Sequence, residues 1–281
     1  MRTLQRLAPA AAPGSPRVSR VVFRGRSALG SLRVTDEPGG IRALWVGEDD
    51  AVQSLVRLGN PDRLVLPYTK AMIAALALCE RPARILVVGL GGGSLPVWLS
   101  RHLPEASVEV VEIDPLVRRV ARRHFGVVEG PRLRVIVDDA ARFLRRTRRQ
   151  WDLVILDAFA GATLPPQLGT SEFLGHVQAR VAPGGAIFGN LWSQARSPAY
   201  GALLRRWADA FPVLHVVRAP RSCNRILVVP PRAWTRGAAL ASAASLRRTF
   251  GLRFDPARIL ALGLDLAPAR LPARARQRAA R

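Results

Sequence analysis

Apolar runs alternate with amphipathic segments along the central part of the chain. The apolar runs are rich in β-branched residues and lie at 84–89, 107–113, 132–137, 152–157, 186–192, 213–218 and 225–229. Segments with helical spacing fall between the first five runs, near 94–103, 115–125, 139–147 and 170–182. Buried strands that alternate with helices are typical of a parallel sheet covered on both faces. The pattern therefore predicts an α/β domain with a mostly parallel, seven-stranded sheet and helices on both faces.

The ends of these segments carry their own signals. Asp114 followed by Pro115 predicts a capped helix start. The sequence APGG at 182–185 predicts a turn between the fourth helix and the fifth strand. Only residues 219–224 separate the last two strands, which is too short for a helical crossover. These two strands are therefore expected to form an antiparallel hairpin at one edge of the sheet.

The chain before this region has a different pattern. Between 18 and 56, short β-like stretches alternate with turns rich in glycine and acidic residues, which predicts a small antiparallel sheet. Residues 61–80 begin as a loop and continue as a helix with an apolar face. The expected organisation is a disordered leader at 1–16, a small β domain at 17–60, a cofactor-binding catalytic domain at 61–231, helices at 232–266 and a basic disordered tail at 267–281.

The chain is strongly basic, with 43 Lys and Arg against 20 Asp and Glu and a formal net charge of +23. Such a charge is typical of proteins that bind nucleic acid or anionic membrane surfaces. However, Lys70 is the only lysine, and the arginines are spread over several predicted helices. We therefore expect solvated helix faces rather than a nucleic-acid surface. No membrane association is expected either, because no apolar run reaches the roughly 18 residues that a membrane span requires.

The cysteines and histidines give no sign of a metal site. Cys79 and Cys223 form no CxxC pair, and the four histidines show no ligand spacing. Two cysteines are also too few for a disulfide framework. We therefore predict free, buried thiols, no bound metal and a reducing compartment, the cytoplasm.

A glycine-rich turn follows the first strand of the main domain. The sequence ILVVGLGGGSL at 85–95 places Gly89, Gly91 and Gly93 between this strand and the next helix, and Ser94 is suited to cap that helix. Glycine lets the backbone turn sharply and lets a ligand approach without meeting a Cβ atom. Because a glycine run alone can also be a structural turn, the residues around it decide the interpretation.

Acidic residues end the three strands that share this sheet with the glycine turn. Glu112 ends the second strand, nineteen residues after Gly93, where nucleotide-binding folds carry a carboxylate for the ribose hydroxyls. Asp138 and Asp139 end the third strand, and Asp157 ends the fourth. Helix capping explains Asp114 well and Asp138 partly, but it explains Glu112 and Asp157 poorly. The sequence therefore predicts a ligand site at the carboxyl edge of the sheet.

Together these motifs resemble those of the spermidine synthases, or polyamine aminopropyltransferases, whose core is shared with the class I S-adenosylmethionine-dependent methyltransferases. The resemblance covers roughly residues 18–230. It is carried by VVGLGGGSL, VEIDP, DDAARFL, WDLVILDAF, TSEFL and APGG, and upstream by SALGSLRV, LWVGEDDAVQS and LVLPYTKAM. It implies a Rossmann-like cofactor-binding domain, a small amine as substrate and a homo-oligomer.

The resemblance also implies how the cofactor would be held. The cofactor would be decarboxylated S-adenosylmethionine, or S-adenosylmethionine itself. Its ribose would be bound by Glu112, and its adenine amino group would donate to Asp139 or to the neighbouring Asp138. The turn against which it lies would be lined by Gly89, Gly91 and Gly93.

Other residues would act on the amine. By the same resemblance, Asp157 would lie beside the attacking nucleophile and take its proton, while Gln53 and Tyr68 would close the pocket from above. Phe159 follows the fourth strand and would either stack on a ligand or fill the core. Trp192, at the end of the fifth strand, is expected in the core.

Three departures from the family pattern keep alternatives open. Spermidine synthases carry an aspartate within the glycine run, and Gly91 stands there in this chain. A second acid in the fourth-strand loop and a Tyr-His-Glu gate are replaced by Ala160 and by Tyr68-Thr69-Lys70. A methyltransferase on the same scaffold is therefore the second hypothesis, and a basic nucleic-acid-binding protein with a vestigial cofactor site is the third. A nicotinamide-dependent enzyme ranks last, because the glycine spacing is compressed relative to GxGxxG.

Overall fold

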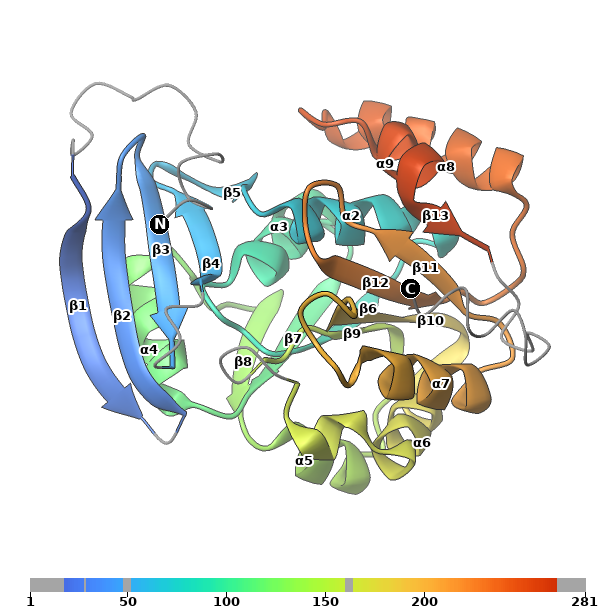
Figure 1. Ribbon diagram of the computed structural model, residues 1–281, viewed down its shortest axis with the longest axis horizontal. Helices are drawn as coiled ribbons and strands as arrows, with labels where there is room; N and C mark the ends of the chain where they lie inside the picture. Colours follow the sequence, from blue (N-terminus) through green and yellow to red (C-terminus); the bar gives the residue numbers. More distant parts are fainter. Residues whose placement is uncertain (1–17, 28, 48–51, 160–163, 267–281) are drawn as a thin grey trace.

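Two sheets stand side by side in the computed structural model, which describes residues 18–27, 29–47, 52–159 and 164–266 (Figure 1). The expected leader at 1–16 and tail at 267–281 lie outside these residues. Within them, no helix has both the length and the apolar character that a membrane crossing demands.

The smaller sheet is N-terminal and antiparallel throughout. One of its faces packs against the main domain, because Leu32 and Leu44 share a buried cluster with helices of that domain. Over the described ranges its strands follow sequence order: β1 (Arg20–Ser27), β2 (Gly30–Glu37), β3 (Ile41–Val46), β4 (Val52–Arg57) and β5 (Asn60–Leu64).

The larger sheet has the expected α/β topology. Its spatial order in the described chain is β13-β11-β12-β10-β9-β6-β7-β8. The strands from β6 to β10 pair in parallel, whereas β12, β11 and β13 pair antiparallel at one edge. The strands are β6 (Arg84–Val88), β7 (Ser107–Glu112), β8 (Leu133–Val137), β9 (Trp151–Leu156), β10 (Val181–Trp192), β11 (His215–Arg218), β12 (Asn224–Val229) and β13 (Leu264–Asp265).

This topology confirms the mostly parallel, Rossmann-like sheet preceded by an antiparallel one, and it confirms the hairpin of the last two predicted strands. The seven predicted strands are all present, and the two-residue β13 joins them beside β11. So short an edge strand gives no periodic pattern in the sequence, and only its tertiary pairing defines it.

Helices cover both faces of the larger sheet. Alternate residues of β6 point to opposite faces: Ile85 and Val87 join one buried cluster, and Leu86 and Val88 join the other. The first cluster lies against α2 (Pro67–Ala75), α3 (Ser94–His102), α4 (Pro115–His124), α8 (Arg236–Phe250) and α9 (Pro256–Gly263). The second lies against α5 (Ala140–Arg146), α6 (Ser171–Ala179) and α7 (Tyr200–Ala210).

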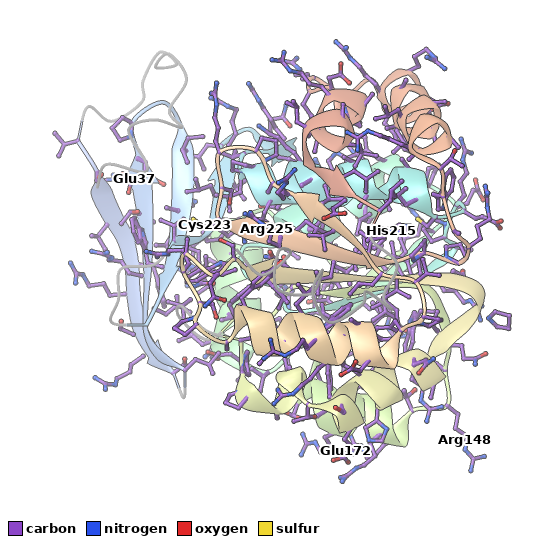
Figure 2. All side chains as sticks on the ribbon, turned by 45° about the vertical axis from the view of Figure 1, so that its right-hand side comes forward. Glu37, Arg148, Glu172, His215, Cys223 and Arg225 are labelled. Carbon is purple, nitrogen blue, oxygen red and sulfur yellow. The ribbon has the colours of Figure 1, made fainter. Side chains whose placement is uncertain are left out.

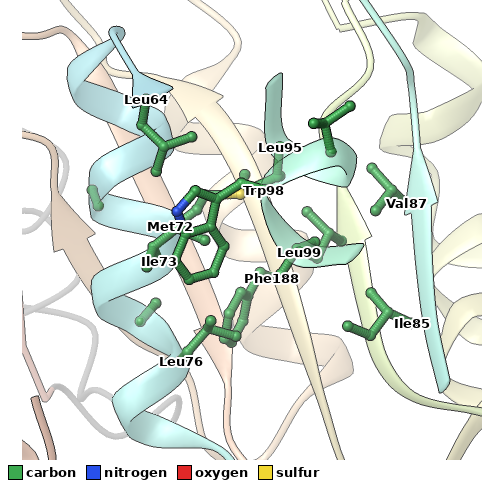
Figure 3. Close-up of a cluster of buried hydrophobic side chains, with 14 of the residues drawn as sticks. Leu64, Met72, Ile73, Leu76, Ile85, Val87, Leu95, Trp98, Leu99 and Phe188 are labelled. Atoms are coloured by element: carbon green, nitrogen blue, oxygen red, sulfur yellow. The ribbon is translucent and has the colours of Figure 1, made fainter. Parts of the chain in front are cut away.

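Two short 3₁₀ turns complete the described elements, η1 (Leu76–Leu78) and η2 (Pro166–Gly169). Figure 3 shows part of the first cluster, in which Met72 and Trp98 lie between helices and sheet. Both side chains are almost fully buried. Burial of apolar side chains of this size stabilises the fold by about 2–3 kcal/mol each, and it fixes the position of the strand ends.

Two local expectations were wrong, and one helix was missed. Residues 61–64, expected to form a loop, belong to β5 and pair with β4. Residues 182–185 lie inside β10, not before it, because α6 ends at Ala179 and the chain pairs with β9 again from Val181. The glycines are absorbed as an irregularity in the ladder between Val181 and Ala186. Helix α7 was not predicted, although Tyr200, Leu203 and Trp207 are buried at helical spacing.

Candidate active site

A pocket of about 320 Å³ is lined by both sheets, at the carboxyl ends of β6, β7, β8 and β9. The smaller sheet contributes Leu44, Val46 and Ser54. Crevices at this edge of α/β sheets are the usual ligand sites. The pocket brings together every predicted site residue except Gly93: Gln53, Tyr68, Gly89, Gly91, Glu112, Asp138, Asp139, Asp157 and Phe159.

The three glycines of the turn have different reasons to be glycine. All three have positive φ, +97° at Gly89, +53° at Gly91 and +77° at Gly93. A Cβ atom at Gly89 would lie 2.4 Å from the backbone oxygen of Asp157, so glycine permits β6 and β9 to end close together. A Cβ atom at Gly93 would lie 2.2 Å from the side chain of Val127. Gly93 is therefore a packing residue below the turn rather than part of the pocket lining.

The sequence suggested that Ser94 caps the helix that follows, but it does not. The N-cap of α3 is Gly93, which has no side chain to donate or accept. The Ser94 hydroxyl instead donates to the backbone oxygen of Leu55 at 3.3 Å and lies 3.3 Å from the hydroxyl of Ser54. Ser94 therefore connects the glycine turn to β4 of the smaller sheet.

Glu112 is buried and supports the turn directly. One carboxylate oxygen accepts from the backbone N–H of Leu90 and the other from that of Asp114, both at 2.9 Å. Burial raises the pKa of the Glu112 carboxyl, although the backbone N–H groups of Asp114 and Leu90 act to lower it. Because each carboxylate oxygen has two lone-pair sites, Glu112 can hold the turn and still accept from a ligand hydroxyl.

The two neighbouring aspartates after β8 differ in their partners. Asp138 accepts from the guanidinium groups of Arg142 and Arg146. Burial acts to raise the pKa of Asp138, but these arginines outweigh it and hold the pKa below its ordinary value. Asp139 caps α5 by accepting from the backbone N–H of Arg142 at 2.8 Å. Because Asp138 is already paired twice, Asp139 is the better candidate to accept from an adenine amino group.

Asp157 occupies the other side of the pocket, immediately after β9. Its carboxylate accepts from the Tyr68 hydroxyl at 3.1 Å and from the Asn190 side-chain amide at 2.9 Å. Burial raises the pKa of Asp157 to about 6, although these two hydrogen bonds act to lower it. Burial and the charge of Asp157 raise the pKa of Tyr68, which therefore stays protonated and remains a donor. A carboxylate with this pKa is suited to general base catalysis near neutral pH.

The aromatic residues at this end correct one expectation. Phe159 lines the pocket and stacks on Trp192, with ring centroids 5.5 Å apart and an interplanar angle of 25°. Trp192 is only half-buried, and the guanidinium of Arg196 lies 5.2 Å from its ring centroid. Trp192 is therefore not a core residue; with Phe159 it forms an aromatic stack next to the pocket.

Several lining residues carried no sequence signal. Ile113 and Ala140 border the pocket, and so does Leu29 from the smaller sheet. Apolar residues of this kind are common everywhere in the chain, so only the fold identifies them. The one available hint was position, because Ile113 and Ala140 directly follow the acids that end β7 and β8.

The thiols lie outside this site. Cys79 is half-buried, and burial raises its pKa to about 12. Cys223 is exposed at the turn of the β11–β12 hairpin, which corrects the expectation of a buried thiol (Figure 2). Both are free cysteines. In the described ranges, no cluster of three or more His, Cys, Asp or Glu side chains is placed to hold a metal ion.

The sequence places this fold and pocket in a known family. Residues 67–201 match the model of the spermine/spermidine synthase domain. A polyamine aminopropyltransferase of Chromobacterium violaceum is 31% identical over 185 residues, which cover 66% of this chain and 69% of that protein. The chain belongs to the spermine/spermidine synthase family. Family membership confirms the resemblance that the sequence motifs indicated.

In other relatives, the match to this chain covers a smaller share of the relative's length. The polyamine aminopropyltransferase of Vibrio vulnificus is 35% identical over 137 residues, 48% of this chain and 46% of that protein. The eEF1A lysine and N-terminal methyltransferase of Bos taurus is 33% identical over 182 residues, 58% of this chain and 26% of that protein. This chain therefore spans between about a quarter and about two thirds of these relatives. All of their names denote transferases, in agreement with the predicted enzyme class.

Solved structures agree on the fold. A spermidine synthase in complex with the transition-state analogue AdoDATO has a TM-score of 0.70 at 16% identity, covering 92% of this chain and 87% of that one. Human methyltransferase-like protein 13 in complex with SAH has a TM-score of 0.61 at 30% identity, covering 67% and 94%. The family and these relatives imply an S-adenosylmethionine-type cofactor.

The residues of the pocket fit such a cofactor. The backbone at Gly89 and Gly91 is bare, and a Cβ atom at Gly91 would come no closer than 3.9 Å to Ser54, so the turn leaves room for a ligand. Glu112 and Asp139 have acceptor oxygens at the ends of adjacent strands. Hydroxyl and amino groups on one rigid ligand require acceptors arranged in this way.

Proposed function

We propose that this protein is an aminopropyltransferase, which moves an aminopropyl group from decarboxylated S-adenosylmethionine to a small amine with Asp157 as general base. The position of Asp157 carries the proposal. Its carboxylate is held by Tyr68 and Asn190 in the same pocket as the glycine turn and Glu112. A half-buried carboxylate beside a nucleotide-type pocket is suited to take a proton from an attacking amine.

The chain's own residues would bind and orient the cofactor. Glu112 would accept from the ribose hydroxyls, and Asp139 would accept from the adenine amino group. Gly89 and Gly91 would let the backbone lie against the ligand. When bound, the cofactor supplies a sulfonium whose attached carbons are electrophilic, so that an uncharged amine can displace the thioether.

Asp157 would provide the proton chemistry. With a pKa of about 6 it is mostly ionised at neutral pH, and it can accept the proton that the amine loses as the new C–N bond forms. Tyr68 and Gln53, which line the pocket from the side of α2 and β4, would close it over the amine. Positioning of the two reactants would supply most of the acceleration.

A methyltransferase is the second candidate, and Gly91 favours it. Spermidine synthases carry an aspartate within the glycine run, which recognises the amine of the decarboxylated cofactor. Gly91 has no side chain for this purpose, although a Cβ atom there would meet only the Ser54 side chain, at 3.9 Å. The eEF1A methyltransferases, with identities similar to those of the aminopropyltransferases, support the same alternative.

Calorimetry with the two cofactors distinguishes the candidates. The aminopropyltransferase proposal expects the full chain to bind decarboxylated S-adenosylmethionine at least as tightly as S-adenosylmethionine. Mass spectrometry of products formed from a panel of mono-, di- and polyamines would then identify the added group. A tenfold preference for the carboxylated cofactor, about 1.4 kcal/mol, together with transfer of a methyl group, would overturn the proposal in favour of the second candidate.

Asp157→Asn tests the role of the base. Turnover is expected to fall by about 10²- to 10⁴-fold, with little change in cofactor affinity, because the carboxylate lies at the amine end of the pocket. Asp209→Asn is the matched control, since Asp209 is exposed on α7. Unchanged turnover in Asp157→Asn would remove Asp157 as the base.

A further inference from the structure

A chain of polar side chains continues behind Asp157, on the side away from Tyr68. Asn190, which donates to Asp157, accepts in turn from the side-chain amide of Asn224 at 2.9 Å. Asn224 accepts from the hydroxyl of Ser222. The Ser222 oxygen then accepts from the backbone N–H of Asn224 at 3.2 Å. Four side chains from β9, β10 and the β11–β12 hairpin are thus connected in series.

The sheet explains why these side chains meet. Gly189 of β10 is paired with Leu156 of β9. Asn190 and Asp157 are the next residues of these two parallel strands, so they lie side by side. Asn190 is paired with Ile226 of the antiparallel β12, which makes Asn224 its diagonal neighbour on the same face. Figure 2 labels Cys223 and Arg225, the two residues that flank Asn224.

The series of hydrogen bonds from Ser222 to Asp157 has a fixed direction. An amide side chain has one donating and one accepting end. Because the Asn224 oxygen accepts from Ser222, its NH₂ group faces Asn190. Because the Asn190 oxygen accepts from Asn224, its NH₂ group faces Asp157. Each step fixes the orientation of the next, and Asp157 always meets a donor.

Burial makes this direction costly to reverse. Asn190 is only 2% exposed and lies in the otherwise apolar strand β10. If the Asn190 amide turned over, its oxygen would face the Asp157 carboxylate, and its NH₂ group would face the NH₂ group of Asn224. A buried polar group that loses its hydrogen-bond partner is not compensated by water, so the observed orientation is preferred.

We propose that Asn190, Asn224 and Ser222 are positioning residues that hold the Asp157 carboxylate ionised and oriented toward the amine. The proposal rests on the role given to Asp157 under the proposed function. With Tyr68 donating to one oxygen and Asn190 to the other, rotation of the carboxylate is restricted, and the remaining lone pairs are available on the pocket side. Donors on both oxygens also favour the charged form of a desolvated carboxylate.

Other titratable groups near Asp157 are few among the described residues. Tyr68, from α2, is in direct contact with its carboxylate. Glu112, Asp138 and Asp139, from the ends of β7 and β8, line the same pocket. Variants of the amides leave all four residues in place, so a change in the titration of Asp157 reports on the hydrogen-bond chain.

The test is the titration of Asp157 in the purified full chain, followed by carbon-13 NMR of labelled aspartate carboxyl groups and assigned with Asp157→Asn. Asn224→Leu removes the donor to Asn190 and is expected to raise the titration midpoint of Asp157 by about one pH unit. Asn224→Asp is expected to raise it further, since a carboxylate cannot donate to Asn190. Ser222→Ala, which removes the first donor of the series, is also expected to raise the midpoint. Ser222→Thr, which keeps the hydroxyl, is expected to titrate like the wild type.

Cys223→Ala is the matched control, because Cys223 lies between Ser222 and Asn224 and has an exposed side chain. Kinetics provide a second readout. Asn224→Leu is expected to lower kcat at pH 7 about tenfold, to move the acid limb of the pH profile upward and to leave the KM for the cofactor unchanged. If folded Asn224→Leu and Ser222→Ala titrate and turn over like Cys223→Ala, the proposal is overturned.

The NMR titration needs no substrate, so the two proposals can fail separately. If the midpoint moves as expected but no group is transferred to any amine, the positioning of Asp157 stands and the proposed function fails. If wild-type activity is present but the midpoint is the same in every variant, the hydrogen-bond chain has no positioning role. Should Asn224→Asp not fold, Ser222→Ala and Ser222→Thr give the same decision.

Discussion

Asp157 combines two properties that oppose each other, a desolvated environment and a charge at neutral pH. Burial raises its pKa from 3.8 to about 6. A carboxyl group with a raised pKa stabilises the folded state fully below its unfolded pKa, and this contribution is lost as the pH rises through the folded value. The ionised base is therefore held at the expense of stability.

We expect Asp157→Asn to be more stable than wild type at pH 7.5, by about 2–3 kcal/mol. Asparagine keeps the shape of the side chain and carries no charge at any pH. Its oxygen can still accept from Asn190, and its NH₂ group can donate to the Tyr68 hydroxyl oxygen. The advantage should shrink steadily as the pH falls from 6 toward 4, where Asp157 is protonated in the wild type. Thermal unfolding at several pH values measures it.

The control for this measurement is Asp209→Asn, whose stability relative to wild type should not follow this pH dependence. A constant difference between Asp157→Asn and wild type from pH 4 to pH 7.5 would contradict the raised pKa. Such a result would place Asp157 in a better solvated environment than its burial indicates.

At the residue scale, position along the strands predicted most of the acids. Glu112, Asp139 and Asp157 each follow an apolar strand, and parallel strands bring their carboxyl ends to one edge. Asn190 and Asn224 gave no comparable signal, because their contact depends on the register between β10 and β12. The separate partners of Asp138 and Asp139 also depend on side-chain contacts that sequence spacing does not fix.

At the scale of elements, the glycine turn between β6 and α3 fixes the distance between the cofactor-binding and base-carrying parts of the pocket. The backbone of Gly89 passes so close to that of Asp157 that no side chain fits between them. The backbone N–H of Leu90 in this turn also donates to the Glu112 carboxylate at the end of β7. Its geometry is therefore shared by three strands rather than determined by the glycine run alone.

Gly89→Ala is expected to reduce stability by about 3 kcal/mol or more, because a Cβ atom would be 2.4 Å from a backbone oxygen at a φ of +97°. Gly175→Ala is the matched control. Gly175 is exposed within α6 with nothing near its Cβ position, so alanine should stabilise that helix by about 0.5–1 kcal/mol.

Denaturant unfolding of both variants measures the two effects. Equal stability changes in Gly89→Ala and Gly175→Ala would contradict the close approach of β6 and β9.

Element boundaries were predicted well where a cap was present, as at Asp114, which accepts from the backbone N–H of Leu116 at 2.7 Å. They were predicted poorly at residues 182–185, where a glycine pair that looks like a turn is tolerated inside a strand.

At the scale of the whole molecule, the pocket exists because the two sheets meet. Leu44 and Val46 come from one sheet, and Glu112 and Asp157 come from the other. Part of the net charge of +23 lies away from this pocket, since Arg119, Arg122 and Arg148 are exposed on the surface (Figure 2 labels Arg148). That nucleic acid is not a partner stays a prediction.

Cofactor binding should therefore stabilise both sheets together. S-adenosylhomocysteine at a hundred times its Kd is expected to raise the free energy of unfolding by about 2.7 kcal/mol. Hydrogen exchange should slow at the glycine turn and also in β3 and β4, whose residues line the same pocket. Protection confined to the larger sheet would contradict a pocket shared by the two, and Gly89→Ala is expected to reduce the protection.

The sequence by itself determined the parallel sheet, its hairpin edge, the antiparallel sheet before it and the acids of the pocket. These features depend on periodicity and on residues at strand ends, which are local properties of the chain. Only the tertiary structure decided that Ser94 bonds β4, that Trp192 stacks on Phe159 outside the core, and that Asn190 and Asn224 support Asp157. Each of these is a contact between elements, and its geometry depends on packing and register, which no single segment encodes.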